Sequence, residues 1–157
     1  MNSKMNDNSR VWIYQANRFL SDQELEVISQ RANEFVQSWS AHGNALAAEV
    51  HVLYKRFVVF FVDENQAQIT GCSIDKSVAL INELGSQFGV DFFDRMQILY
   101  RENNVIKESR MHDFWAKRKA ELVNDETPVF NNLVKTKGEF DASWETVFGE
   151  SWHASMW

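Results

Sequence analysis

Residues 56–63, RFVVFFVD, place six consecutive apolar residues between two charged ends, a pattern typical of a strand that is buried on both faces. The run is far shorter than the roughly 20 apolar residues that cross a bilayer. The preceding residues alternate between apolar and polar side chains from Ala48 to Lys55, which predicts a neighbouring strand with one wet face. Between these strands, Lys55 and Arg56 lack the Asn-Gly or Asp-Gly of a two-residue hairpin, so the turn is the weakest part of this prediction.

Amphipathic helices are predicted on both sides of this strand pair. Residues 20–24, LSDQE, form a capping box in which Ser21 and Glu24 satisfy each other's backbone amides. A second apolar helical face runs from Ile74 to Phe88 and ends at Gly89, where a left-handed C-cap suits glycine. With short strands at 11–14 and 96–101, the order is strand, helix, strand, strand, helix, strand. This order predicts an α+β protein with a ferredoxin-like, split βαβ fold, an antiparallel sheet with both helices on one face.

The domain organisation follows from the same pattern. Residues 1–10 are polar and are predicted to be disordered. Residues 11–157 are predicted to form a single α+β domain, in which 11–101 are the ferredoxin-like core and 102–157 a C-terminal α/β extension. In the extension, a helix is expected near 111–122 and a strand near 128–134, followed by an irregular, Trp-rich end.

Composition excludes several classes of function. The chain of 157 residues has a formal net charge of −6 and no long basic block, which argues against a nucleic-acid partner. Its start, MNSKMNDNSR, has no apolar core of a signal peptide, and Cys72 is the only cysteine, so a cytoplasmic protein without a membrane partner is expected. The four histidines and Cys72 form neither a paired-cysteine zinc motif nor a His-Glu-x-x-His helix, so no metal and no cofactor are expected.

Residues 71–77, GCSIDKS, resemble the phosphate-binding loop of nucleotide hydrolases, and residues 58–64 have the shape of a Walker B strand. Asp75, however, stands where the loop needs glycine, and its carboxylate would face the phosphate. Asp63 also lies on the strand that leads into the loop, whereas the magnesium-binding aspartate must come from a different strand. ATP hydrolysis is therefore not expected.

Two interpretations of this segment remain. In the first, it is simply the start of the second helix, with Ser73 as N-cap and Asp75 in the first turn. In the second, backbone amides at the helix start hold a small anion or other small molecule, or Cys72 acts as a nucleophile. The candidate ligand-binding residues are Cys72, Ser73, Asp75, Lys76 and Ser77.

Aromatic residues are concentrated at the C-terminus. They can anchor an interface with a protein partner or with a second copy of the chain, or they can lock the terminal segment onto a core. The candidate interface residues are Trp144, Trp152, His153 and Trp157.

Several stretches, VWIYQANR, TGCSIDKSV, FGVDFFDRM, VFNNLVKTKGEF and the terminal SWH, resemble a family of short bacterial proteins known chiefly from the Bacteroidetes. These proteins often carry the label ABC transporter ATPase, which the missing glycine at position 75 argues against transferring to this chain. The resemblance implies a cytoplasmic bacterial protein and supplies no catalytic residues. The leading hypothesis is a non-enzymatic binding protein, acting as a homodimer or with another protein, and the alternative is the small-molecule, anion or thiol site near Ser73.

Overall fold

The computed structural model describes residues 1–41, 43–65 and 67–156, and the chain divides into two compact units. The first unit comprises Met1–Asp94 and Lys135–Gly138, and the second comprises Arg95–Val134 and Glu139–Trp157. The boundary lies before the predicted division at residue 101, because the strand at 97–102 pairs with strands that follow it. Each unit is described by itself below.

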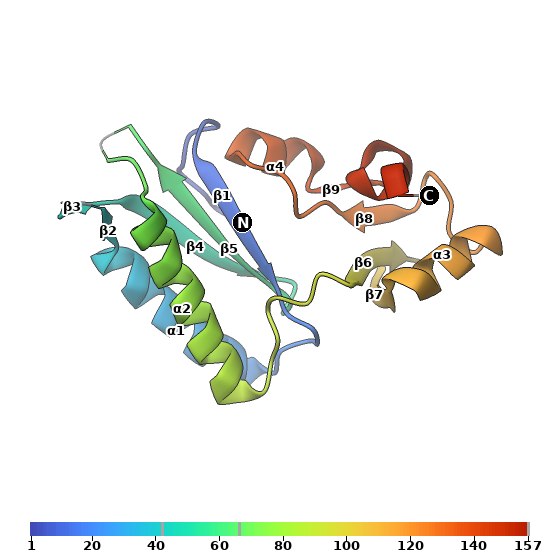
Figure 1. Cartoon of the computed structure of the whole chain (residues 1–157), viewed down its shortest axis with the longest axis horizontal. Coiled ribbons are helices and arrows are strands. Elements are labelled where there is room, and N and C mark those ends of the chain that lie inside the picture. The colour runs from blue at the N-terminus through green and yellow to red at the C-terminus, as the bar shows by residue number, and fades with distance from the viewer. Residues whose placement is uncertain (42, 66, 157) are drawn as a thin grey trace. The chain divides into compact units, whose positions relative to one another are not determined.

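The first unit is a three-stranded antiparallel sheet covered by two helices on one face (Figure 1). β5 (Phe57–Asp63) lies between β1 (Arg10–Gln15) and β4 (Ala47–Leu53), so the predicted central strand is confirmed. Alternate β5 residues, Val58, Phe60 and Val62, pack with the apolar faces of the helices. The helices are α1 (Asp22–Ser38) and α2 (Gly71–Phe88), and a short hairpin, β2 (Ser40–Ala41) and β3 (Asn44–Ala45), follows α1.

The complete ferredoxin-like arrangement is not confirmed. It requires a fourth strand beside β1, but β6 (Gln97–Glu102) pairs instead with β7 (Val105–Arg110) and β8 (Pro128–Phe130). Asn103 and Asn104 both adopt left-handed backbone (φ 54° and 64°), so a tight hairpin joins β6 to β7. Such a local hairpin costs less loop-closure entropy than pairing with a strand near the start of the chain. The outer edge of β1 receives the segment at 135–137, where Val11 N–H donates to the Lys135 carbonyl.

The second unit is built on a four-stranded antiparallel sheet of order β7-β6-β8-β9, with β9 at Glu145–Val147. α3 (Met111–Lys119) follows β7 directly, and α4 (Lys137–Ser143), which contributes Glu139–Ser143 to this unit, precedes β9. Two short 3-10 helices, Phe148–Glu150 and Trp152–Met156, end the described chain. A buried cluster fills the unit: Ile98, Tyr100, Phe114, Val123, Val129 and Phe148.

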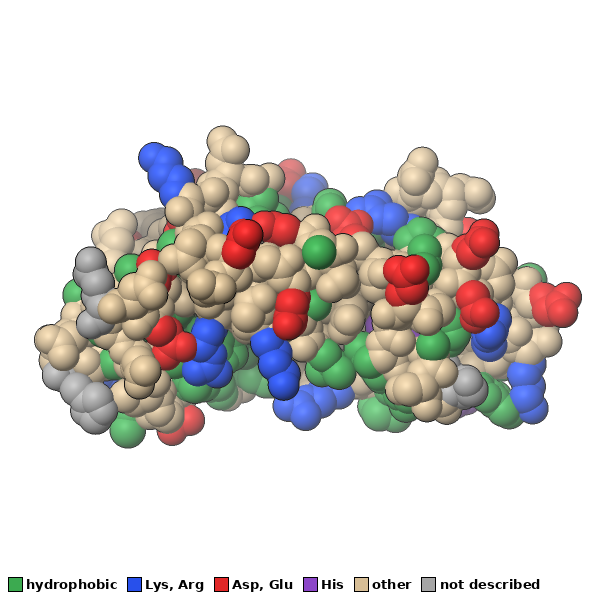
Figure 2. Space-filling view, turned by 90° about the horizontal axis from the view of Figure 1, so that it is seen from above, with side chains coloured by type: hydrophobic (Ala, Val, Ile, Leu, Met, Phe, Trp, Pro, Cys, Tyr) green, Lys and Arg blue, Asp and Glu red, His purple; other side chains and the backbone are tan. Residues whose placement is uncertain are grey.

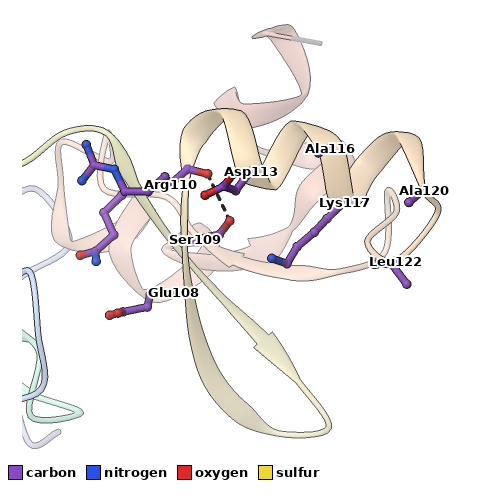
Figure 3. A pocket seen from close by; sticks show the side chains of 9 residues that line it. Glu108, Ser109, Arg110, Asp113, Ala116, Lys117, Ala120 and Leu122 are labelled. Carbon is purple, nitrogen blue, oxygen red and sulfur yellow. Dashed lines mark hydrogen bonds between the residues drawn. The ribbon is translucent and has the colours of Figure 1, made fainter.

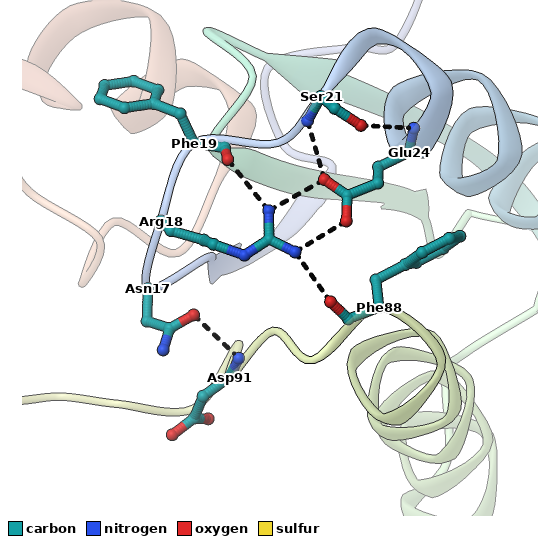
Figure 4. A network of polar contacts seen from close by, with 7 residues as sticks. All are labelled: Asn17, Arg18, Phe19, Ser21, Glu24, Phe88 and Asp91. Atoms are coloured by element: carbon teal, nitrogen blue, oxygen red, sulfur yellow. Dashed lines mark hydrogen bonds and ion pairs between the residues drawn. The ribbon is translucent and has the colours of Figure 1, made fainter.

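The predicted capping box at the start of α1 is confirmed and belongs to a larger network (Figure 4). Arg18 donates to both carboxylate oxygens of Glu24, at 2.9 and 2.7 Å, and to the carbonyl of Phe88 at the end of α2. The Arg18 hydrogen bonds, followed by the Ser21 amide, lower the pKa of Glu24 to about 2. The stabilisation from this carboxylate is therefore complete above about pH 4.5 and is lost as the pH falls toward 2.

The segment at residues 1–9, predicted to be disordered, makes specific contacts with the first unit. Ser3 Oγ donates to Glu49 on β4 at 2.8 Å, and the Lys4 amide donates to the same carboxylate. Burial raises the pKa of Glu49, but hydrogen bonds from His51, Ser3 and Lys4 outweigh it, and the net pKa is lowered. Ser9 is buried just before β1 begins.

The β4–β5 turn begins at Tyr54, one residue earlier than predicted, and is strained. Tyr54 and Lys55 both have φ 56°, the left-handed backbone that a type I′ turn requires and that glycine adopts more readily. We expect Lys55→Gly to raise the free energy of unfolding by about 0.5–1 kcal/mol, since relief of strain exceeds the entropy of the added glycine. The lost ion pair between Lys55 and Asp22 is largely exposed and contributes little.

Urea unfolding of the purified protein measures this effect. Lys55→Ala is the matched control, because it removes the ion pair but keeps a Cβ on the left-handed backbone, and it should not stabilise. A lower unfolding midpoint for Lys55→Gly than for the parent protein would contradict the assignment of strain to this turn.

Candidate functional site

An open groove of about 580 Å³ lies in the second unit between β7 and α3 (Figure 3). Arg110 is both the last residue of β7 and the N-cap of α3, so the helix leaves the strand without a loop. The strand and the helix therefore form the two walls of this groove. Its lining residues are Gln97, Glu108, Ser109, Arg110, Asp113, Ala116, Lys117, Ala120 and Leu122.

One face of α3 forms the helical wall. Asp113, Ala116, Lys117 and Ala120 have the spacing i, i+3, i+4, i+7, which places them on one side of a helix. Phe114 lies on another side of α3 and is buried in the core. Ala116 and Ala120 have small side chains, which leaves space for a ligand next to Asp113 and Lys117.

The groove carries both signs of charge. Glu108 and Asp113 are acidic, and Arg110 and Lys117 are basic. Asp113 Oδ1 lies 3.0 Å from Nε2 of the exposed His112. Lys117 extends from α3 on the side of the groove, and its ammonium has no hydrogen-bond or ion-pair partner in the described part of the chain (Figure 3).

The lining of this groove offers charged and hydrogen-bonding side chains. Ser109 is the hydroxyl residue in its lining, and its Oγ donates to the Arg110 carbonyl. Within residues 1–41, 43–65 and 67–156, no group of three or more His, Cys, Asp or Glu residues is arranged to hold a metal ion. No helix among these residues has the length and apolar character needed to cross a membrane. On the face shown in Figure 2, acidic and basic side chains are interspersed, without a broad basic area.

The structure starts the second helix earlier than predicted. Gly71 is its first residue, and the N-cap is Thr70, not Ser73, since Thr70 Oγ1 accepts the Ser73 amide at 3.2 Å. Asp75 consequently lies beyond the first turn. The signal that sequence reasoning missed is Thr70 itself, a good capping residue three positions before Ser73.

The five candidate ligand-binding residues at 71–77 lie on two sides of α2. The Ser73 hydroxyl donates to the Ser40 carbonyl at 2.8 Å, and Ser77 Oγ lies 3.1 Å from the hydroxyl of Tyr14, whose pKa is raised by burial. Both serines are buried, whereas Cys72, Asp75 and Lys76 are exposed. None of the five lines the groove between β7 and α3, nor either of two further hollows in the first unit, one beside the end of α2 and one beside the start of α1. The structure therefore does not bring them together into one site.

Two of the candidate interface residues are in the interior of the second unit. Trp144 is buried, stacks on Phe140 at 4.6 Å and donates from Nε1 to Asn132 at 2.9 Å. His153 is buried beneath the half-buried Trp152, whose ring lies 4.0 Å away. For Trp144 and His153, burial favours the interpretation in which the aromatic segment locks onto a core over the one in which it forms an interface, because a small unit with short elements uses large aromatic side chains to fill its core. Trp157 lies outside the described residues.

A buried Ser-His contact occurs in this C-terminal segment. Ser151 Oγ lies 2.7 Å from Nδ1 of His153, the arrangement of a nucleophile and a base. The same oxygen accepts the His153 amide and donates to the Phe148 carbonyl, so it caps the last 3-10 helix. Both residues are buried, and burial lowers the pKa of His153 to about 4. These contacts make Ser151 a structural cap of the segment.

Comparison with protein-family models, with curated proteins and with solved structures finds no match for this chain. The function is therefore inferred from the groove and its residues.

Proposed function

We propose that the protein acts by binding rather than by catalysis, and that the groove between β7 and α3 holds an extended segment of a partner protein. The observation that supports this proposal is the position of β7 at the end of its sheet, directly beside the groove. A strand at the edge of a sheet can receive an added strand through backbone hydrogen bonds, while pockets beside it recognise alternate side chains. β7 and α3 supply both parts of this arrangement.

A partner protein fits this edge better than a second copy of the chain does. If two copies of β7 pair as antiparallel strands around a two-fold axis, the residue at the axis lies directly opposite the same residue of the other copy. A register that pairs five residues of β7 must be centred on Lys107 or on Glu108. Either centre places like charges directly opposite each other, which destabilises an antiparallel pair. Self-association through β7 is therefore disfavoured, while a different strand can offer opposite charges.

Filling the groove tests this proposal. A displayed library of random nine-residue peptides is selected against the full chain, and the selected peptides are measured on the variant Ala116→Trp, which places an indole on the helical wall. We expect the affinity to fall by about 10-fold or more, since the ring occupies the space of the peptide. Ala79→Trp is the matched control, because Ala79 is exposed on α2 in the first unit and should leave binding unchanged.

Two results would overturn the proposal. Either the library yields no peptide that binds the folded chain, or the selected peptides bind Ala116→Trp as well as they bind the parent protein. Thermal unfolding of both tryptophan variants checks that each remains folded.

A further inference from the structure

The three basic residues in the last turn of α3 differ in their partners. Arg118 Nη2 contacts Asp125 Oδ1 at 2.6 Å, and the Lys119 ammonium lies 3.8 Å from the centre of the Trp115 ring. The ammonium of Lys117, which lines the groove, has neither a hydrogen bond nor an ion pair in the described part of the chain, and the Lys117 backbone carbonyl accepts a bond from the Leu122 amide. Favourable interaction with the helix dipole applies to all three residues and does not explain this difference.

We infer that Lys117 selects a carboxylate on the bound segment, so that the groove prefers an extended peptide with an acidic residue at this position. This inference rests on the proposed function, because it names the chemistry of the segment that the groove binds. The Lys117 side chain is already partly buried, so part of its desolvation cost is met before binding. A carboxylate that reaches it gains a charge-assisted hydrogen bond in a partly dry site.

The surroundings of Lys117 define the rest of the pattern. Ala120 and Leu122, whose side chain is 73% exposed, place apolar surface beside the ammonium. Asp113 lies one helical turn earlier on the same wall and repels a second carboxylate while attracting a basic group. Four residues of helix span about 6 Å, and two residues of a strand span about 6.7 Å. Side chains two positions apart on an extended segment therefore have the spacing of Asp113 and Lys117, so the pattern combines a basic and an acidic residue two positions apart.

Charge exchange tests this pattern. The probes are two nine-residue peptides of alternating Thr and Val, one with Lys and Glu two positions apart and one with Lys at both positions. The affinity of the full chain for each is measured by titration of backbone amide NMR signals. We expect the parent protein to prefer the Lys-Glu peptide, and Lys117→Glu to reduce its affinity for that peptide roughly 10- to 100-fold. The same variant should bind the Lys-Lys peptide more tightly than the parent protein does.

Lys119→Glu is the matched control, because it makes the same charge change on the same helix outside the groove lining. It should change either affinity by no more than about 2-fold. Lys117→Gln provides a second measurement should Lys117→Glu fail to fold, and it should abolish the preference between the peptides.

The outcomes separate this inference from the proposed function. Suppose that Ala116→Trp abolishes binding of both peptides, while Lys117→Glu and Lys117→Gln still prefer the Lys-Glu peptide as the parent protein does. The groove then binds extended peptides, but Lys117 does not select their acidic residue. That result overturns the inference alone. If neither these peptides nor any library peptide binds the folded parent protein, both the proposed function and the inference are wrong.

Discussion

Phe114→Ala is expected to lower the free energy of unfolding of the second unit by about 3–5 kcal/mol, the range for truncating a fully buried phenylalanine. The Phe114 side chain is 0% exposed. Its ring centroid lies 5.3 Å from that of Tyr100 and 5.8 Å from that of Phe148, so it joins the sheet to the C-terminal segment. The other large side chains of this small core are already packed, so they do not readily fill the cavity that alanine would leave.

Hydrogen exchange of backbone amides measures this loss separately in each unit. Protection of β6 and β8 should fall in Phe114→Ala, because those strands carry Tyr100 and Val129. Trp115→Ala is the matched control, since this neighbouring side chain is 38% exposed and its removal should cost less than about 1 kcal/mol. A loss below 1 kcal/mol for Phe114→Ala would show that α3 is not anchored through this ring.

Local sequence signals predicted the parts of the fold that depend on neighbouring residues. The apolar run at 57–62 identified the central strand, and the Ser21–Glu24 spacing identified the start of α1. The position of the strand at 97–102 depends on which strand it pairs with, and its apolar pattern alone does not distinguish pairing beside β1 from pairing with β7 and β8. The turn at Asn103 and Asn104 was the available signal that favours the local hairpin.

The groove could not be predicted from the sequence for a similar reason. α3 has a single buried residue, Phe114, so its apolar pattern does not reveal which side faces the core. The spacing of Asp113, Ala116 and Lys117 becomes meaningful only when β7 is known to be an edge strand beside α3. The aromatic tail left two interpretations open, and burial of Trp144 within the second unit favours the structural one.

The stability of the second unit should depend on pH through His153. Burial lowers its pKa from 6.5 to about 4, and its side chain is 2% exposed. Above pH 6.5 the imidazole is neutral in both the folded and the unfolded state, so no stability is lost. Between pH 6.5 and 4 the unfolded chain binds a proton that the folded chain excludes, and the free energy of unfolding falls as the pH falls. The total loss by pH 4 is about 3 kcal/mol, at 1.36 kcal/mol for each unit of pKa difference.

Urea unfolding at pH 7 and at pH 4.5 measures this dependence, and His153→Phe should remove most of it. The phenyl ring keeps the apolar volume against Trp152 and Phe148 but cannot bind a proton. Its stability at pH 7 should fall because the contact with Ser151 is lost, yet the difference between the two pH values should shrink. His112→Gln is the control, since this exposed side chain should leave the difference unchanged. An undiminished difference in His153→Phe would assign the pH dependence to other groups, because the Glu24 carboxylate loses its stabilising effect only below about pH 4.5.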